Sequence, residues 1–174
     1  MKTIIRTSLL LATVFVIFTS CENLDAKFTF STSDITFTYG PDTITGNLVL
    51  TQDTIQSELD SLIQKNGTTI DKLNSVKLKS CVITITSPDT GNFNSFNSFE
   101  IYISTPTLAQ IQLAALNPVP RDTNSVSLAV NGNEIASYIK SPTFYFMLKG
   151  NKTKPITYPI SVSIHAEYEV SAGM

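Results

Sequence analysis

Residues 160–170 read Ile160-Ser-Val-Ser-Ile-His-Ala-Glu-Tyr-Glu-Val170, and apolar and polar side chains alternate through the whole stretch. Successive side chains of a β-strand point to opposite faces of its sheet, so strict alternation indicates a strand with one buried face. A strand of about eleven residues is long by the usual standard, and it needs pairing partners along its length. The rest of the chain is therefore expected to supply a sheet.

Several other stretches are rich in β-branched and aromatic residues and are bounded by turn-forming Gly, Pro, Asn and Asp. They are residues 28–30, 35–39, 43–50, 76–85, 99–104, 125–130 and 143–148. Within 76–85 the apolar positions change from even to odd numbers near Ser80-Cys81, which indicates a β-bulge. Seven or eight short strands predict an antiparallel β-sandwich, and a small β-barrel is the alternative.

Residues 53–65 depart from the alternating pattern and predict one amphipathic helix that covers an end or a face of the sheet. Asp53 stands at the N-cap position, and Asn66-Gly67 ends the pattern. The apolar residues fall on one helical stripe, at Ile55, Leu59, Leu62 and Ile63. Residues 105–117 predict a second, short helix that begins at Thr105-Pro106 and ends at Asn117-Pro118, and residues 69–73 predict a further turn.

The composition suits a single extracytoplasmic β domain. The chain has 174 residues, of which 15% are charged, well below the usual quarter. Residues 28–174 have the length of one domain, and no linker or internal repeat divides them. The net charge is −2, and the Lys and Arg residues are scattered. A basic patch for the phosphate backbone is therefore missing, which excludes nucleic acid as a partner.

The N-terminal 20 residues have the three parts of a signal peptide. Residues 1–6 are basic, residues 9–18 are apolar but too short to span a bilayer, and the small Thr19-Ser20 precede Cys21. This order resembles the lipobox of bacterial lipoproteins. The resemblance implies that residues 1–20 are removed, that Cys21 receives a diacylglycerol and usually an N-acyl chain, and that residues 21–27 form a lipidated tether. More than one acyl chain anchors a protein stably.

In layout the chain resembles the small outer-membrane and surface lipoproteins of the Bacteroidota. Acidic residues follow Cys21, and the domain is rich in Ser, Thr and Asn. Three Asp-(Ser/Thr)-apolar tripeptides resemble the O-glycosylation acceptor of that group, which implies three candidate acceptors: Thr43, Thr54 and Ser61. The resemblance also implies an outer-membrane location, either at the periplasmic face or at the cell surface.

Few residues could carry catalysis or bind a metal. The chain has one histidine, His165, which shares the polar face of its strand with Ser163 and Glu167. Such a row lacks the sharp turn that raises a nucleophile beside an oxyanion hole. One histidine and one free cysteine cannot build a zinc site, and no calcium loop is present. We therefore expect no catalytic residue, metal or cofactor. Cys81, inside an apolar strand, is expected to be buried and inert.

Residues 91–99 contain phenylalanines at every third position among amides and hydroxyls. In a loop, Phe93 and Phe96 could stack on a sugar while the Asn side chains bind its hydroxyls. Phe99 enters the next strand, and the alternative for the other two is packing over the end of the sandwich. Phenylalanine lacks the polar group that Tyr and Trp bring to a wet site. Phe93 and Phe96 are thus the candidate glycan contacts.

These observations predict a lipid-anchored envelope protein that acts as a non-catalytic accessory or interaction module at the outer membrane. Its expected partners are the membrane, through Cys21, and another envelope protein or a glycan. Two alternatives stay open. A glycan-binding or glycan-hydrolysing surface lipoprotein would, for hydrolysis, need two carboxylates from different strands. A lipid carrier would need an internal cavity.

Overall fold

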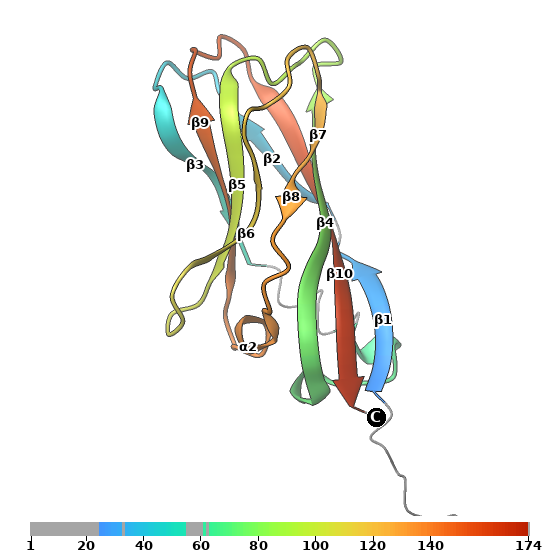
Figure 1. The fold of residues 1–174 in the computed structure, drawn as a ribbon. Helices are drawn as coiled ribbons and strands as arrows, with labels where there is room; N and C mark the ends of the chain where they lie inside the picture. The colour runs from blue at the N-terminus through green and yellow to red at the C-terminus, as the bar shows by residue number, and fades with distance from the viewer. Residues whose placement is uncertain (1–24, 33, 55–60, 62, 174) are drawn as a thin grey trace, which may run out of the picture.

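The computed structural model describes residues 25–32, 34–54, 61 and 63–173, and Figure 1 shows their strands in two facing sheets. Every strand pair in both sheets is antiparallel. Within the described residues the two sheets stay separate and do not close into a barrel. The predicted β-sandwich is therefore confirmed, and the barrel alternative is not adopted.

The first sheet is built around its C-terminal strand, β10 (Ile160–Gly173). One edge of β10 pairs along most of its length with β4 (Leu73–Ser87). The other edge is shared by β1 (Asp25–Ser31) and β2 (Ile35–Tyr39). The short β7 (Ser125–Ser127) continues the sheet beyond β4. Strand β10 is thus the central member on which three other strands depend.

The second sheet has the strand order β3-β9-β5-β6-β8. These strands are β3 (Gly46–Asp53), β9 (Tyr145–Lys152), β5 (Phe96–Ser104), β6 (Ile111–Leu116) and β8 (Ala129–Val130). Short helices whose bounds lie within the described residues include the 3₁₀ turn η1 (Ile70–Lys72) and α2 (Ala136–Ile139). The predicted turn at 69–73 is thereby confirmed as η1.

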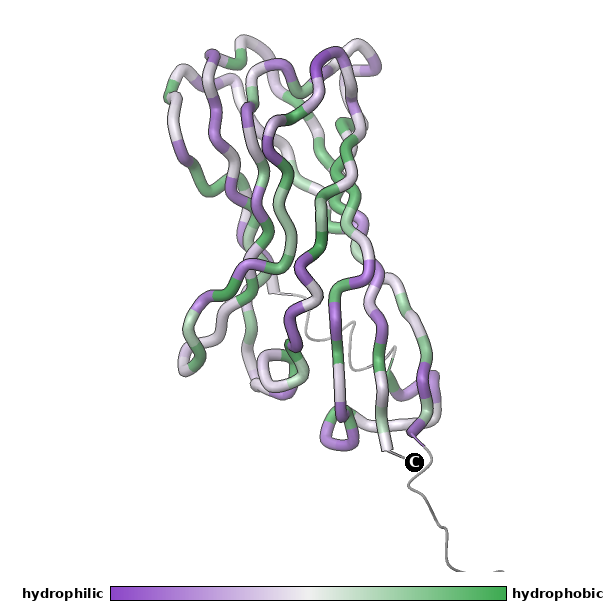
Figure 2. The backbone as a smooth tube through the Cα atoms, in the orientation of Figure 1, coloured by the Kyte–Doolittle hydropathy of each residue, from purple (hydrophilic) through white to green (hydrophobic). Residues whose placement is uncertain are grey.

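The core lies between the two sheets and follows the alternation of the strands. Figure 2 shows apolar and polar segments alternating along the chain in both layers. In β10, every second residue from Ile160 to Ala172 is buried. Tyr168 stacks on Phe30 of β1, with ring centroids 5.3 Å apart. The predicted half-buried strand at 160–170 is confirmed, and it runs for fourteen residues.

The predicted bulge is also present. The register between β4 and β10 shifts between Glu167 and Tyr168, which pair with Ser80 and Leu78. Lys79 is therefore the extra residue, and the buried positions of β4 change from Leu78 to Cys81 across it. One additional residue reverses the parity of the side chains, so both halves of β4 keep their apolar face toward the core.

The short helix predicted over 105–117 is wrong, because residues 111–116 form strand β6. This strand pairs with β5, with Phe99 opposite Leu116 and Ile103 opposite Ile111. The hydroxyl of Thr105 accepts hydrogen bonds from the backbone N–H groups of Thr107 and Leu108, at 3.2 and 2.8 Å, as a helix cap would. The open edge of β5 offers a ladder of backbone partners, and this tertiary pairing outweighs the local helix propensity of Gln, Leu and Ala.

The amphipathic helix predicted over 53–65 lies partly outside the described residues. Asp53 is the last residue of β3, where it pairs with Phe146, and its carboxylate accepts the N–H of Thr54 at 2.7 Å. Residues 61 and 63–65 are helical, and Ile63 is buried. At the N-terminus of the domain, β1 begins at Asp25, so the last three residues of the predicted tether 21–27 belong to the sheet.

Candidate functional site

The two ends of the sandwich differ in what they carry. At one end β1 begins and β10 finishes, with Asp25 paired to Gly173; we call this the anchor end (Figure 1). The connections 40–45, 88–95, 117–124 and 153–159 gather at the opposite end, which we call the distal end. Cys21 itself lies outside the described residues. It precedes Asp25 by four residues, which reach at most about 14 Å when extended.

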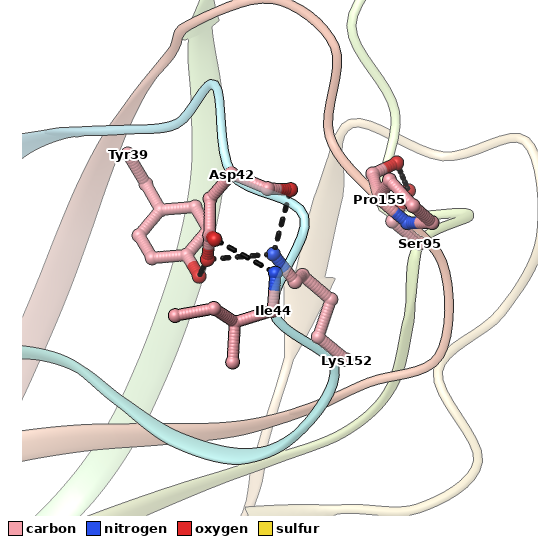
Figure 3. A network of polar contacts seen from close by, with 6 residues as sticks. All are labelled: Tyr39, Asp42, Ile44, Ser95, Lys152 and Pro155. Atoms are coloured by element: carbon pink, nitrogen blue, oxygen red, sulfur yellow. Dashed lines mark hydrogen bonds and ion pairs between the residues drawn. The ribbon is translucent and has the colours of Figure 1, made fainter.

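An ion pair between Lys152 and Asp42 lies at the distal end, and Figure 3 shows its contacts. The side chain of Lys152 is 0% exposed, and its Nζ lies 2.8 Å from Asp42 Oδ2 and 3.1 Å from the Asp42 carbonyl oxygen. The Tyr39 hydroxyl donates to Asp42 Oδ2 at 2.5 Å, and the Ile44 N–H donates to Oδ1 at 2.8 Å. One carboxylate thus joins the end of β9 to the connection between β2 and β3.

Electrostatics hold both members of this pair in their charged forms. The hydrogen bond from Lys152, followed by those from Tyr39 and Ile44, lowers the pKa of Asp42 to about 2. Burial by itself would lower the pKa of Lys152, but its interactions with Asp42 and Tyr39 outweigh burial and raise it. Burial and the bond to Asp42 raise the pKa of Tyr39. None of the three exchanges a proton near neutral pH, so the cluster is a structural clamp.

The three candidate glycosylation acceptors are all accessible. Thr43, Thr54 and Ser61 are exposed. In the first tripeptide Ile44 is also 62% exposed, whereas Asp42 is turned toward Lys152. Residues 55 and 62, the apolar members of the other two tripeptides, lie outside the described residues. The three acceptor residues therefore lie at the surface, and their modification stays a prediction.

The predicted glycan contacts at Phe93 and Phe96 are wrong. Both rings are buried, at 1% and 2% exposure, and their centroids lie 5.1 and 4.9 Å from that of Phe99. The chain turns between them, because the N–H of Phe96 donates to the carbonyl of Phe93. This turn directs both rings into the core, so the phenylalanines fill the distal end of the sandwich and offer no face to a sugar.

The polar row on β10 is assembled differently from a catalytic triad. His165 Nδ1 lies 2.8 Å from Asp34 Oδ1, and the Ser163 hydroxyl donates to Asp34 Oδ2 at 2.6 Å. The bond from Ser163, followed by that from His165, lowers the pKa of Asp34. Glu167 pairs instead with Lys79, at 3.0 Å. The serine thus contacts a carboxylate rather than the imidazole, so the serine–histidine hydrogen bond of a catalytic triad is not formed.

Sequence reasoning missed Asp34, which is 131 residues from His165 in the chain and reaches it only through the β1–β2 connection. It likewise missed the pairing of Asp42 with Lys152, across 110 residues. Among the residues that the structure describes, no group of three or more His, Cys, Asp or Glu side chains could hold a metal ion. None of the helices in the same residues is long and apolar enough to cross a membrane.

Cys81 is buried in β4, as predicted, and burial raises the pKa of its thiol to about 12. Since the thiolate is the reactive form, we expect the folded protein to resist thiol reagents. Iodoacetamide at pH 8 should label Cys81 at least about 100-fold more slowly in the native protein than in urea. Mass spectrometry of the Cys81 peptide measures this ratio. Equal rates in both states would show an exposed thiol and contradict its structural role.

The outer face of the second sheet carries a polar hollow that the sequence did not single out. It has a volume of about 240 Å³ and lies over three adjacent strands, β3, β9 and β5. Its lining residues are Asn47, Ser98, Glu100, Tyr102, Lys149, Gly150 and Asn151. The signal in the sequence was the alternation of Ser98, Glu100 and Tyr102 with buried Phe99 and Ile101, which marks the first three as outward-facing.

Comparisons with known proteins add little to this geometry. No family model matches the chain, and no curated protein matches it. Among solved structures, a chain from Desmodium yellow mottle tymovirus is similar over 87% of this chain and 90% of its own length. The two are 10% identical, and their TM-score is 0.30. At that TM-score the likeness carries no argument about fold or function.

Proposed function

We propose that this chain is a lipid-anchored cell-envelope protein that acts as a non-catalytic accessory or interaction module at the outer membrane. The observation that carries the proposal is the position of the first strand. Strand β1 begins at Asp25, at the anchor end, only four residues after the cysteine that the lipobox pattern marks for acylation. A lipid on Cys21 would hold the anchor end against the bilayer.

The same arrangement would turn the distal end and its four connections away from the membrane. The polar clusters at Asp42 and at Asp34 also support a non-catalytic role, because their side chains bind one another and stabilise the fold. Asp42 and Lys152 form a clamp, and the Ser163 hydroxyl is bound to Asp34 rather than to the imidazole of His165. Thr43, Thr54 and Ser61 stay the candidate acceptors for O-glycans on this envelope module, which would bind another envelope protein or a glycan.

Replacing the acylated cysteine tests the anchor directly. We expect Cys21→Ser to abolish acylation and to move the protein from the membrane fraction to the soluble fraction, because a lipid chain contributes about 0.8 kcal/mol per buried CH₂. Fractionation and metabolic labelling with an alkyne fatty acid measure both effects. Cys81→Ala is the matched control, because Cys81 is buried in β4. This substitution should leave the labelling and the fractionation unchanged.

A Cys21→Ser protein that stays in the membrane fraction and still incorporates the fatty acid would contradict the proposal. Protease treatment of intact cells distinguishes the two faces of the outer membrane. Digestion of the wild-type protein in intact cells would place it at the cell surface, and digestion only after the outer membrane is opened would place it on the periplasmic face.

A further inference from the structure

The hollow on the second sheet is built on three adjacent strands, near the start of β3 and β5 and the end of β9. Asn47 of β3 stands opposite Asn151 of β9, which in turn stands opposite Ser98 of β5. Two residues further along β9 and β5, on the same face, Lys149 stands opposite Glu100. Side chains at paired positions on one face of a sheet are neighbours, so these groups form two parallel polar rows. Their spacing is set by the backbone ladder rather than by a loop.

Each row presents hydrogen-bonding groups that the protein itself does not use. Asn151 Nδ2 donates to Asn47 Oδ1 at 2.7 Å, which fixes both amides and leaves the Asn47 amide N–H groups and Asn151 Oδ1 unused. The Tyr102 hydroxyl donates to Glu100 Oε2 at 2.8 Å, which leaves Oε1 unused. The Ser98 hydroxyl has no partner among the described residues. The hollow therefore presents both donors and acceptors to an occupant.

The charges in the hollow compensate one another. Lys149 Nζ lies 4.4 Å from the centroid of the Tyr102 ring and donates to Gln110 Oε1 at 2.9 Å. Glu100 supplies the one carboxylate of the lining and Lys149 the one ammonium, so the lining has no net charge. An anionic ligand would be repelled by the carboxylate of Glu100, and a cationic ligand would be repelled by the ammonium group of Lys149. The neutral lining therefore favours an occupant without net charge.

Size restricts the occupant further. The hollow holds about 240 Å³, below the ~300–1,000 Å³ of pockets that enclose drug-sized ligands. A sugar ring is small, uncharged and carries adjacent hydroxyls that both donate and accept hydrogen bonds, as the rows require. We propose that this hollow binds a neutral saccharide. Asn47 and Asn151 would bind its hydroxyls from one side and Ser98 and Glu100 from the other.

The inference rests on the proposed function, because it names a neutral glycan as the ligand of the envelope module, but binding does not depend on the lipid. The two can therefore fail separately. Loss of membrane attachment concerns Cys21, whereas saccharide binding concerns β3, β9 and β5. A protein that binds saccharide without being acylated would sustain this inference and overturn the anchor.

Affinity electrophoresis of the detergent-extracted full chain tests the inference. Native gels contain one neutral polysaccharide each (soluble starch, xylan, mannan or mixed-linkage β-glucan), and parallel gels contain acidic polygalacturonate or no polysaccharide. We expect at least one neutral polysaccharide to slow the migration of the protein. Polygalacturonate should leave its migration unchanged. Asn47→Ala and Asn151→Ala should each weaken the interaction up to about tenfold, since one hydrogen bond contributes ~0.5–1.5 kcal/mol.

Gln52→Ala is the matched control, because Gln52 is exposed on the same strand as Asn47 but does not line the hollow. It should migrate like the wild type in every gel. Normal migration with all four neutral polysaccharides would overturn the inference. So would retardation by polygalacturonate alone, which would indicate an anion site at Lys149, or retardation that Asn47→Ala and Asn151→Ala leave unchanged.

Discussion

Ending the chain before Tyr158 should leave no folded protein. The truncation removes β10, which is a pairing partner of β1, β2 and β4. It also removes the buried side chains of Ile160, Val162, Ile164, Ala166, Tyr168, Val170 and Ala172. A large buried apolar side chain contributes roughly 1.5–3 kcal/mol, whereas a whole domain has a net stability of only ~5–15 kcal/mol. We expect insoluble or degraded protein, measured by the soluble yield and by circular dichroism.

His165→Ala is the control on the same strand. The imidazole is 49% exposed and lies on the outer face, so its removal should change the free energy of unfolding by less than about 1 kcal/mol. The variant should also keep any binding activity found for the wild type. A truncated chain that stays soluble and unfolds cooperatively would contradict the central role of β10, and loss of binding in His165→Ala would reopen the outer face of β10 as a functional site.

Asp42→Ala should destabilise the protein far more than Lys152→Met. The lysine side chain is fully buried, so removal of its carboxylate partner leaves an ammonium group without a counter-charge in the core. Lys152→Met instead removes the buried charge and leaves Asp42, whose side chain is 22% exposed, in contact with water. We expect Asp42→Ala to lower the melting temperature by on the order of 10 °C and Lys152→Met to lower it by much less.

The double variant gives the sharpest form of this test. Adding Lys152→Met to Asp42→Ala should restore part of the lost melting temperature, because it removes the uncompensated charge. A double variant less stable than Asp42→Ala, or a single Lys152→Met as damaging as Asp42→Ala, would show that the unpaired ammonium is not the main cost. Differential scanning calorimetry of the four proteins measures these effects.

Acid provides an independent check of the same pair. The pKa of Asp42 is lowered in the folded state to about 2, from an ordinary value of 3.8. A carboxylate whose pKa falls on folding stabilises the protein above its ordinary pKa, and that stabilisation is lost as the pH decreases toward the folded-state pKa. The stability difference between the wild type and Asp42→Ala should therefore shrink between about pH 4 and pH 2. A constant difference over this range would contradict the ion pair.

The fold was predictable because its signals are local. Alternation within 160–170 identifies a half-buried strand without knowledge of its partners, since the two faces of a strand follow from backbone geometry alone. The change of parity near Ser80 indicates the bulge for the same reason. The burial of Cys81 follows from its place in an apolar strand. These features need no information from other parts of the chain.

The prediction failed where the local sequence was compatible with two different structures. Residues 111–116 contain good helix formers, yet they form β6 because the edge of β5 is available to them. Phe93 and Phe96 stand among polar residues, yet the turn between them directs both rings into the core. In both cases the decisive contact comes from tertiary structure, which a local pattern does not contain.

The sequence by itself determined the class of fold, the long half-buried C-terminal strand and the N-terminal pattern from which the anchor is proposed. Only the tertiary structure paired Asp42 with Lys152, and it alone placed Asp34 beside His165 and joined Asn47, Asn151 and Ser98 in one hollow. The physical reason is the distance along the chain over which the residues involved act on one another. Side-chain periodicity is written within a few residues, whereas each of these polar groups meets a partner from a strand or connection distant in the chain.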